Sequence, residues 1–447
     1  MEVMGWNPIC ILWMKKRAEA LRMLISLLVV MIVLLLMGFP MMMTMLFSTL
    51  FYMIFFMPDV ETFTSVQQMV LGVQSPVLLA IPMFMLAADI MCTGQTSKRL
   101  LDFVESYVGH LPGGMATTTA ITCALFGSIS GSTQATVVAV GRPVRNRLLE
   151  NGYDDSEVMA LIINASNLAY LIPPSLGMIV YGVASGASIG DLFIAGIGPA
   201  ILIIIMFSIY SAFYAKVKKI PSLKKASNKQ RWVATKKCLL AFGFPLIIMG
   251  GIYTGIFSPT EAAAAAVLYA IIVEVGFYKS IKIQEIYNIA LSTGVITTVV
   301  FILVAVGAAF SWIISYARVP QLIAEGLLGN DPSILTILLV VNIFFFIGCM
   351  FVEAIVVILI LTPIFVPIAS AAGIDLIHLG IIVTLQVAIG SGTPPFGTSI
   401  FTCSAIFDQP YLKVIKNQGP YIAMLLIACV LVSAFPSISL YLGSFAQ

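Results

Sequence analysis

The sequence has little charge and few of the residues on which most enzymes rely. Only 10% of its 447 residues are Asp, Glu, Lys or Arg, whereas soluble domains contain about 25%. It has two histidines, and it contains no HExxH, Walker A or GxSxG motif. A net charge of +3 is too small to indicate nucleic-acid binding. These absences argue against a soluble protein and against an ATP-driven or hydrolytic enzyme, so we expect no catalytic residues and no cofactor.

Paired cysteines are missing as well. The seven cysteines are scattered, and most lie in apolar runs. No two of them have the spacing of a disulfide framework or of a metal site. We therefore interpret them as small core residues.

Long apolar runs dominate instead. Hydrophobic residues make up 60% of the chain, and the mean hydropathy is +1.05. At about 20 residues per span, this predicts an all-α, polytopic membrane protein with roughly ten to twelve membrane segments. The segment 216–237 is hydrophilic and rich in Lys and Arg, with no acidic residue. The positive-inside rule places it in the cytoplasm.

Two apolar segments are interrupted by Pro-Pro pairs, at Pro173-Pro174 and at Pro394-Pro395. Proline removes a backbone donor and breaks a helix. In hydrocarbon every backbone polar group needs a partner, so such a break is tolerated only inside protein or beside a water-filled cavity. Two broken helices in corresponding positions are a strong pointer to a transport site.

The two halves of the chain share a register with an offset of 221 positions. The pairs that share it are Pro173 and Pro394, Gly127 and Gly348, Asp154 and Asp375, and Pro199 and Pro420. Because Gly and Pro specify backbone geometry, this coincidence predicts two inverted-topology repeats, each with a re-entrant hairpin and a broken helix.

This register defines the predicted organisation of the chain. An N-terminal extension (1–22) and N-terminal scaffold helices (23–73) precede repeat 1 (74–215), which has its hairpin tip at 127–133 and its break at 173–174. The basic cytoplasmic loop (216–237) and connecting scaffold helices (238–289) follow. Repeat 2 (290–447) has its tip at 348–353 and its break at 394–395.

Several polar residues within apolar runs allow more than one interpretation. The stretch from Gly127 to Gly131 is a GxxxG motif of the kind that packs helices closely, but its density of hydroxyls favours an ion or substrate loop. Asn164 and Asn167 lie in an apolar run. Buried amides must pair, so they either pair with the facing hairpin tip or bind a ligand, and both possibilities stay open.

Three acidic residues have different expected roles. Glu353 lies at the second tip, where an intramembrane carboxylate is a functional candidate; it could bind a cation, relay a proton or accept hydrogen bonds from the tip backbone, and we favour the last. Glu261 fits a capping box after Ser258. Glu274, near a predicted helix end, is expected at the membrane interface.

Four motifs in order resemble the large membrane subunit of TRAP (tripartite ATP-independent periplasmic) transporters. They begin at Gly127, Ile172, Gly251 and Thr393. The resemblance implies a sodium-coupled, elevator-type importer of organic acids, such as C4-dicarboxylates or sialic acid, in the bacterial inner membrane. It also implies a small four-helix membrane subunit and a periplasmic substrate-binding protein as partners.

The resemblance implies that the tips and breaks form the sodium sites and flank the substrate. The residues at those positions are Ser128, Ser130, Gly131, Ser132 and Pro173 in repeat 1, and Gly348, Glu353, Thr393, Pro394, Gly397 and Thr398 in repeat 2. We expect Thr133, Asn164, Asn167, Ser175 and Ser399 to contact substrate. Sodium is the only metal ion expected.

Two alternatives to this interpretation remain. An ion-coupled dicarboxylate symporter that works alone would share the broken helices, and a neighbouring gene for a binding protein would argue against it. A membrane enzyme or scaffold would need a catalytic dyad or a soluble domain, and the sequence offers neither. The chain also departs from the family in three places that concern the site. An aspartate is common after the first tip, where Gln134 stands here, and the second tip often carries Asp where Glu353 stands. The run before the first Pro-Pro is usually small and contains glycine, whereas here it is 164–170 with two asparagines.

Overall fold

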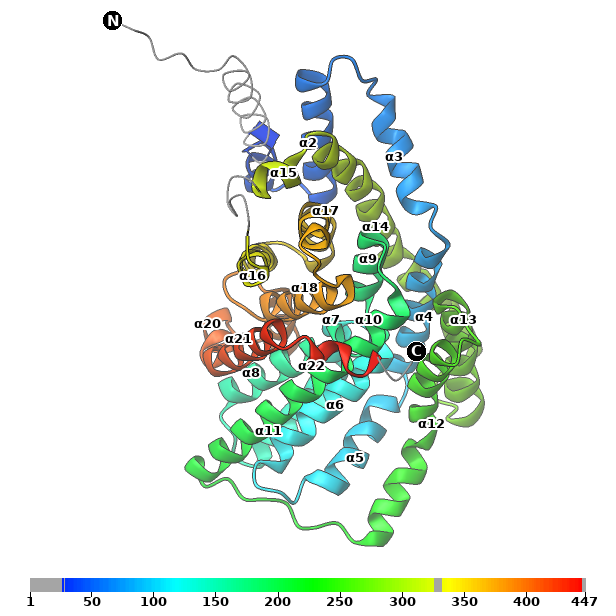
Figure 1. Ribbon diagram of the computed structural model, residues 1–447. Helices are drawn as coiled ribbons and strands as arrows, with labels where there is room; N and C mark the ends of the chain where they lie inside the picture. Colours follow the sequence, from blue (N-terminus) through cyan, green and yellow to red (C-terminus); the bar gives the residue numbers. More distant parts are fainter. Residues whose placement is uncertain (1–25, 28, 325–331, 444–447) are drawn as a thin grey trace, which may run out of the picture.

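The computed structural model describes residues 26–27, 29–324 and 332–443, and every regular element in this part is a helix (Figure 1). Seven helices are long and apolar enough to cross a membrane, and five shorter apolar helices accompany them. The prediction of an all-α membrane protein is therefore confirmed. The predicted N-terminal extension, 1–22, lies outside the described residues.

One layer of helices comes from the N-terminal and connecting parts of the chain. Its elements are α2 (Met41–Phe56), α3 (Phe63–Val73), η1 (Pro76–Leu79), α4 (Ala80–Thr93), α12 (Asn228–Tyr253), α13 (Pro259–Ile271), the π-helical turn η3 (Ile272–Phe277) and α14 (Ile283–Tyr316). The long helix α14 packs against α2, α3 and α4, and α4 also packs against α13. Glu261 closes the predicted capping box at the start of α13, since its Oε2 accepts from the Ser258 N–H at 2.8 Å.

The remaining elements form two related sets. The first comprises α5 (Thr96–Val108), α6 (Gly114–Ser130), α7 (Thr133–Glu150), α8 (Asp155–Ser166), η2 (Asn167–Tyr170), α9 (Leu176–Ser185), α10 (Ile189–Ala195) and α11 (Ile197–Lys218). The second comprises α15 (Val319–Ile323), α16 (Ile334–Phe351), α17 (Ala354–Ala371), α18 (Leu376–Ser391), α19 (Thr398–Phe407), α20 (Tyr411–Ile415), α21 (Gln418–Ala434) and α22 (Ser437–Leu440). In the register of 221 positions, helices α6, α7, α8, α9 and α11 correspond respectively to α16, α17, α18, α19 and α21.

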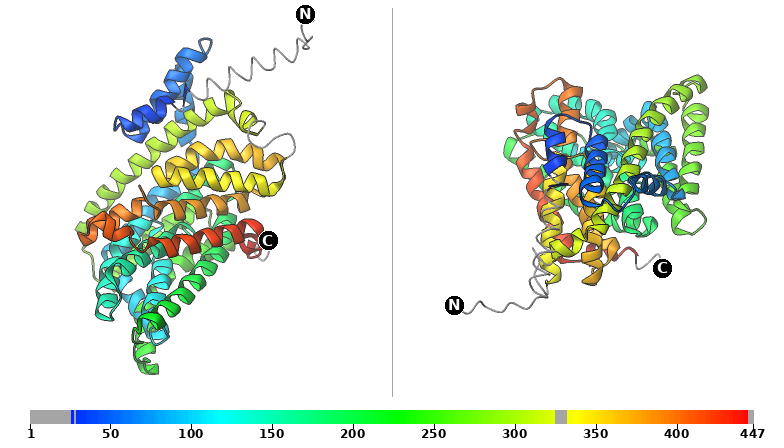
Figure 2. Two further views of the ribbon diagram at one scale, coloured as in Figure 1. Left: turned by 90° about the vertical axis from the view of Figure 1, so that its left-hand side faces the viewer. Right: turned by 90° about the horizontal axis from the view of Figure 1, so that it is seen from above.

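The contacts of α21 show that the two sets run in opposite directions. Lys413, just before α21, pairs with Asp155 at the start of α8 (2.6 Å). The far end of α21 lies beside the first half of α16, where Asn342 Nδ2 donates to Ser433 Oγ (3.2 Å). Hairpin α16–α17 therefore enters from the membrane side opposite to the turn that starts α8. The left view of Figure 2 shows α16, α18 and α21 one below another.

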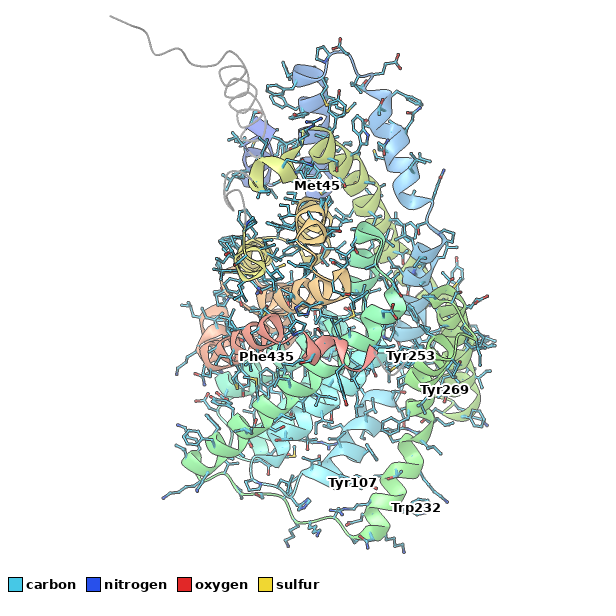
Figure 3. The ribbon with its side chains drawn as sticks, viewed as in Figure 1. Met45, Tyr107, Trp232, Tyr253, Tyr269 and Phe435 are labelled. Carbon is cyan, nitrogen blue, oxygen red and sulfur yellow. The ribbon has the colours of Figure 1, made fainter. Side chains whose placement is uncertain are left out.

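The basic segment forms less loop than predicted. Helix α11 continues to Lys218 and α12 begins at Asn228, so the irregular stretch is 219–227 and not 216–237. A capping box between Ser227 and Gln230 starts α12 early. Trp232 is 61% exposed on its first turns (Figure 3), a placement typical of an aromatic anchor at the membrane–water interface.

The expectation for Glu274 was wrong, because its side chain is fully buried. Thr96 Oγ1 donates to Glu274 Oε1 at 2.6 Å, and the Ser280 hydroxyl donates to the other carboxylate oxygen. Gly94 leaves room for this carboxylate, since a Cβ there would lie 2.0 Å from Glu274 Oε2. The partner at Thr96 lies 178 positions away in the chain, which is why the sequence around Glu274 did not reveal it.

Candidate functional site

The first hairpin tip is a two-residue turn held by hydroxyl groups. Gly131 ends α6 in the left-handed region (φ 58°), and Ser132 caps α7 by accepting from the Ala135 N–H. Ser130 Oγ donates to the Ser132 carbonyl at 3.1 Å and lies 2.9 Å from Thr136 Oγ1. The hydroxyls predicted to bind sodium therefore also shape the turn.

The second tip uses a carboxylate in the same register position as Ser132. Glu353 caps α17, and its Oε2 accepts from the Ile355 N–H at 3.0 Å. This is the favoured interpretation of Glu353, a carboxylate that accepts hydrogen bonds from the tip backbone. Gly348 lies on the inner face of the hairpin, where a Cβ would lie 2.9 Å from Val357 Cγ1.

Both breaks lie in the middle of buried helical segments. In the first, a cis Pro173-Pro174 bond is followed by Ser175, which caps α9 by accepting from the Met178 N–H. In the second, Thr393 Oγ1 donates to the Ile389 carbonyl at 2.6 Å, a cis Pro394-Pro395 bond follows, and α19 begins at Thr398 after Gly397. Ser175, which is predicted to contact substrate, therefore caps α9 in the structure.

Each hairpin approaches the break of its own repeat at a glycine. A Cβ on Gly131 would lie 2.7 Å from the Pro174 carbonyl oxygen. In the other repeat, a Cβ on Gly390 would lie 2.3 Å from Cys349 Cβ. Only residues without a side chain allow these backbones to come so close.

Two asparagines join the repeats to each other. Asn167 Oδ1 accepts from Ser391 Oγ at 3.0 Å and from Ser399 Oγ at 2.9 Å. Asn164 Nδ2 donates to Gln418 Oε1 on α21. Both amides therefore pair with the opposite repeat, and not with the facing hairpin tip that the sequence suggested.

Tyr170 and Ser391 also belong to this site and were missed, and Gln134, which was noted only as a departure from the family, belongs to it as well. Gln134 Oε1 accepts from Thr133 Oγ1 at 3.1 Å, and its Nε2 donates to Thr398 Oγ1 at 3.4 Å. Tyr170 is buried at the end of η2, shortly before the first break. Their signal in the sequence was weak: each is a single polar residue beside a Gly or Pro break.

The donor set of this site consists of hydroxyl, amide and carbonyl oxygens with one carboxylate. Hard oxygen ligands of this kind at unwound helices suit small alkali cations. Within residues 26–27, 29–324 and 332–443, no group of three or more His, Cys, Asp and Glu side chains could hold a metal ion.

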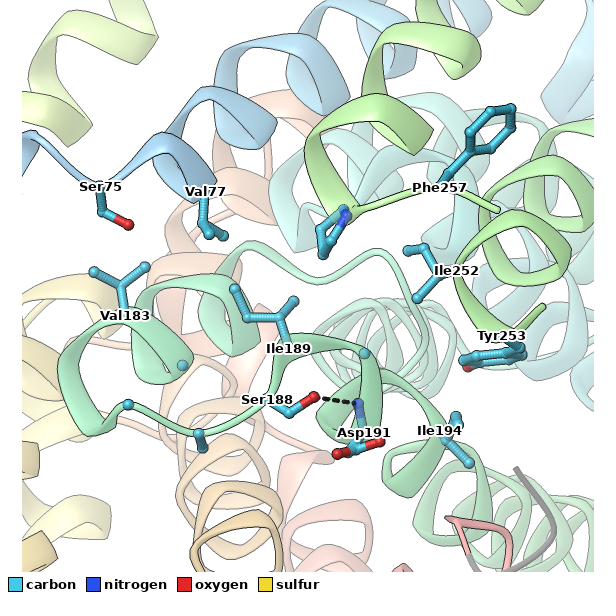
Figure 4. A pocket seen from close by; sticks show the side chains of 15 residues that line it. Ser75, Val77, Val183, Ser188, Ile189, Asp191, Ile194, Ile252, Tyr253 and Phe257 are labelled. Atoms are coloured by element: carbon cyan, nitrogen blue, oxygen red, sulfur yellow. Dashed lines mark hydrogen bonds between the residues drawn. The ribbon is translucent and has the colours of Figure 1, made fainter. Parts of the chain in front are cut away.

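A cavity of about 580 Å³ lies at the boundary between repeat 1 and the scaffold layer (Figure 4). Its walls come from the end of α9, the loop before α10 and the α12–α13 connection, and they include Gly182, Asp191 and Tyr253. The Asp191 N–H donates to Ser188 Oγ at 3.4 Å on one wall. None of the tip or break residues predicted for the site lines this cavity.

Two hairpins that face two broken helices in a duplicated helical fold define a secondary-transporter architecture. The crystal structure of the YdaH transporter from Alcanivorax borkumensis has this fold, with a TM-score of 0.61 over 84% of this chain and 87% of that one at 17% identity. Residues 28–438 match the model of the tripartite ATP-independent periplasmic transporter, DctM component. The chain belongs to this family.

Curated relatives agree with this assignment. The chain is 56% identical to the ectoine TRAP transporter large permease protein TeaC of Halomonas elongata, over 86% of this chain and 90% of that one. It is 53% identical to the ectoine/5-hydroxyectoine large permease protein UehC of Ruegeria pomeroyi (86% and 90%) and 38% identical to the C4-dicarboxylate large permease protein DctM of Pseudomonas aeruginosa (82% and 86%). The protein is thus a multi-pass transport subunit of a bacterial inner membrane, and not an enzyme.

Proposed function

We propose that this protein is the transport subunit of a sodium-coupled, binding-protein-dependent importer of ectoine or a closely related zwitterion. The relatives named for ectoine are 56% and 53% identical to this chain, whereas a relative named for C4-dicarboxylates is 38% identical. Ectoine carries a carboxylate, as the predicted organic acids do, but its amidinium group balances that charge.

The charge of the site supports a zwitterion over a dicarboxylate. The residues predicted for ion and substrate binding include no Lys, Arg or His, and Glu353 is their one ionisable side chain. A buried dianion would have only the bound sodium ions as countercharges, since no side chain of the site supplies a positive charge, and a buried charge that is not fully paired is disfavoured. A net-neutral molecule needs only a donor for its carboxylate and an acceptor for its cation.

The observation that carries the proposal is the identity to the relatives named for ectoine, and a pair of amides between the breaks agrees with it. Asn167 Nδ2 and Asn164 Oδ1 are buried, and neither has a hydrogen-bond partner in the described part of the chain. Both lie close to Gly392, at 2.7 and 3.2 Å from the position of a Cβ on that residue. They provide one donor and one acceptor where the two repeats meet, near the place at which such transporters bind substrate.

The proposed partners and movement follow from the family. A small four-helix membrane subunit and a periplasmic binding protein complete the importer. The hairpins and broken helices move together as an elevator against the layer of α2–α4 and α12–α14. Sodium binds to the hydroxyl and carbonyl oxygens of the tips and breaks, so its gradient drives that movement.

The test is uptake of labelled ectoine into proteoliposomes that contain this chain and its small subunit. We expect uptake to require the binding protein and an inward sodium gradient, and unlabelled ectoine to compete better than malate or sialic acid. Uptake without the binding protein would instead favour a symporter that works alone. Preferential competition by malate would restore the dicarboxylate prediction.

Two variants test sodium binding within the same assay. Ser130→Ala and Thr393→Ala should raise the sodium concentration for half-maximal uptake several-fold, because each removes a hydroxyl ligand. Thr298→Ala is the matched control, since the Thr298 hydroxyl donates to a carbonyl four residues earlier as Thr393 does, but on exposed α14. Sodium titrations that match the control in both variants would rule out sodium sites at these hydroxyls.

A further inference from the structure

Helix α5 lies between hairpin α6–α7 and helix α12 of the scaffold layer (Figure 1). Polar side chains tie both of its ends to that layer. At its start, Thr96 Oγ1 donates to Glu274 Oε1 on η3 at 2.6 Å. At its other end, the Ser106 carbonyl accepts from Arg231 Nε on α12 at 3.1 Å.

Aromatic contacts hold the middle of α5 to the same layer. The Phe103 ring packs edge-on against the Phe242 ring of α12, with the ring centroids 5.1 Å apart. The Arg99 guanidinium lies 3.6 Å from the centroid of the Tyr278 ring, just after η3. Although α5 also packs against α6, which follows it in the chain, it is held to the scaffold layer at its start, middle and end.

One arginine of the first hairpin reaches across to α5. Arg147, in the last turn of α7, donates from Nη2 to Asp102 Oδ1 at 2.7 Å and from Nη1 to Glu105 Oε2. Asp102 and Glu105 are three positions apart, so they lie on one face of α5. A single guanidinium therefore binds two carboxylates of the helix that the scaffold layer holds.

The other ion pairs among the described residues do not reach the scaffold layer. Asp155, at the start of α8, pairs with Arg145 of α7 at 2.7 Å and with Lys413 of α20 at 2.6 Å. Both pairs lie within the hairpins and broken helices, and they move with these helices in the proposed elevator. The pairs of Arg147 instead join a moving helix to a fixed one, so they break when the hairpin slides along α5.

We propose that the contacts of Arg147 with Asp102 and Glu105 form a latch, which favours the conformation of this structure and opens in every transport cycle. The inference rests on the proposed elevator movement. The Arg147 and Glu105 side chains are each 28% exposed, so water replaces the lost contacts when the latch opens. Exposed ion pairs are weak, and the latch therefore shifts the balance between conformations by only about three- to tenfold.

Double electron–electron resonance in lipid nanodiscs measures this balance. Spin labels are attached at Asn146→Cys on α7 and Lys229→Cys on α12, both exposed positions, in a chain without its native cysteines. We expect two distances, one of which matches this structure. Arg147→Gln should lower the share of that distance relative to the other about three- to tenfold. Arg142→Gln is the matched control, because Arg142 is exposed on the same helix and forms no ion pair with a described residue.

A second variant removes the latch from its fixed side. Asp102→Asn/Glu105→Gln should cause the same shift, even if Arg147→Gln does not fold, and combining the two should shift the ratio no further. A ratio that stays at the value of the Arg142→Gln control in these variants would overturn the latch. A single distance in every variant, with and without sodium and ectoine, would overturn the proposed elevator movement itself and the latch with it.

Discussion

At the scale of single residues, Asn167 joins the two repeats through two hydrogen bonds. Its Oδ1 accepts from both Ser391 and Ser399. Asn167→Ala deprives the buried Ser399 hydroxyl of this acceptor, while Ser391 keeps a second bond to the Ala388 carbonyl at 3.0 Å. An unsatisfied buried group costs about 1–3 kcal/mol, so we expect a clear fall in the thermal unfolding temperature in detergent.

A double-mutant cycle isolates this contact. Ser399→Ala alone removes a donor that Asn167 can partly replace with Ser391. The double variant Asn167→Ala/Ser399→Ala should therefore be less destabilised than the sum of the single variants, by roughly 0.5 kcal/mol or more. Strictly additive effects would show that the Asn167–Ser399 hydrogen bond does not couple the repeats.

Asp155, the first residue of α8, makes stability depend on pH. Burial opposes its ionisation, but Arg145 at 2.7 Å and Lys413 at 2.6 Å outweigh burial and hold its pKa below the ordinary value of 3.8. The folded state therefore keeps Asp155 ionised at a pH at which the unfolded chain takes up a proton. Its stabilisation is fully present above the unfolded-state pKa and is lost as the pH falls through the folded-state pKa.

Asp155→Asn tests this dependence. The pair with Lys413 is partly exposed, so we expect the variant to lose only about 1 kcal/mol at pH 7. The difference in stability between the variant and the unaltered protein should disappear as the pH falls below 3.8. Unfolding midpoints measured in detergent at each pH would show this. A gap that persists unchanged at acid pH would mean that the loss comes from packing and not from charge.

At the scale of elements, the first hairpin depends on one glycine. Gly131→Ala places a side chain at φ 58° and brings its Cβ to 2.7 Å from the Pro174 carbonyl oxygen. Gly152→Ala is the matched control. Gly152 has a φ of 88°, so its variant has the same kind of backbone strain, roughly 1–2 kcal/mol, but its added Cβ would contact no atom within 4 Å. We expect uptake to fall at least tenfold in Gly131→Ala and to change little in Gly152→Ala. Similar uptake by both would show that the contact between tip and break is dispensable.

At the scale of the whole molecule, the proposed elevator needs hairpin α16–α17 to slide past α14. The two meet where a Cβ on Gly307 would lie 3.1 Å from Leu359 Cβ on α17. Gly307→Cys/Leu359→Cys should form a disulfide under oxidation, because Cβ atoms of cystines lie about 3.5–4.5 Å apart. We expect uptake to fall more than tenfold on oxidation and to recover with a reductant, while each single variant is unaffected. Full uptake by the cross-linked protein would rule out sliding at this contact.

Much of this protein could be predicted from its sequence, because the membrane leaves the backbone few options. Long apolar runs must be helices there, and Pro173-Pro174 and Pro394-Pro395 mark the places where those helices break. The register of 221 positions then located both hairpins and predicted that the two halves would share one architecture. Glu261 followed from local rules too, since a capping box spans only four residues.

Only the tertiary structure determined the contacts between polar side chains that lie far apart in the chain. Glu274 is buried because Thr96 reaches it from another helix, and Asn167 pairs with Ser391 and Ser399 of the other repeat. Local pattern cannot reveal such partners, because a buried polar side chain is satisfied by whatever group the fold brings near it. For the same reason, the sequence did not predict the surroundings of Gln386. They depend on how α16, α18 and α21 pack together, an arrangement that leaves Gln386 Oε1 without a partner among the described residues.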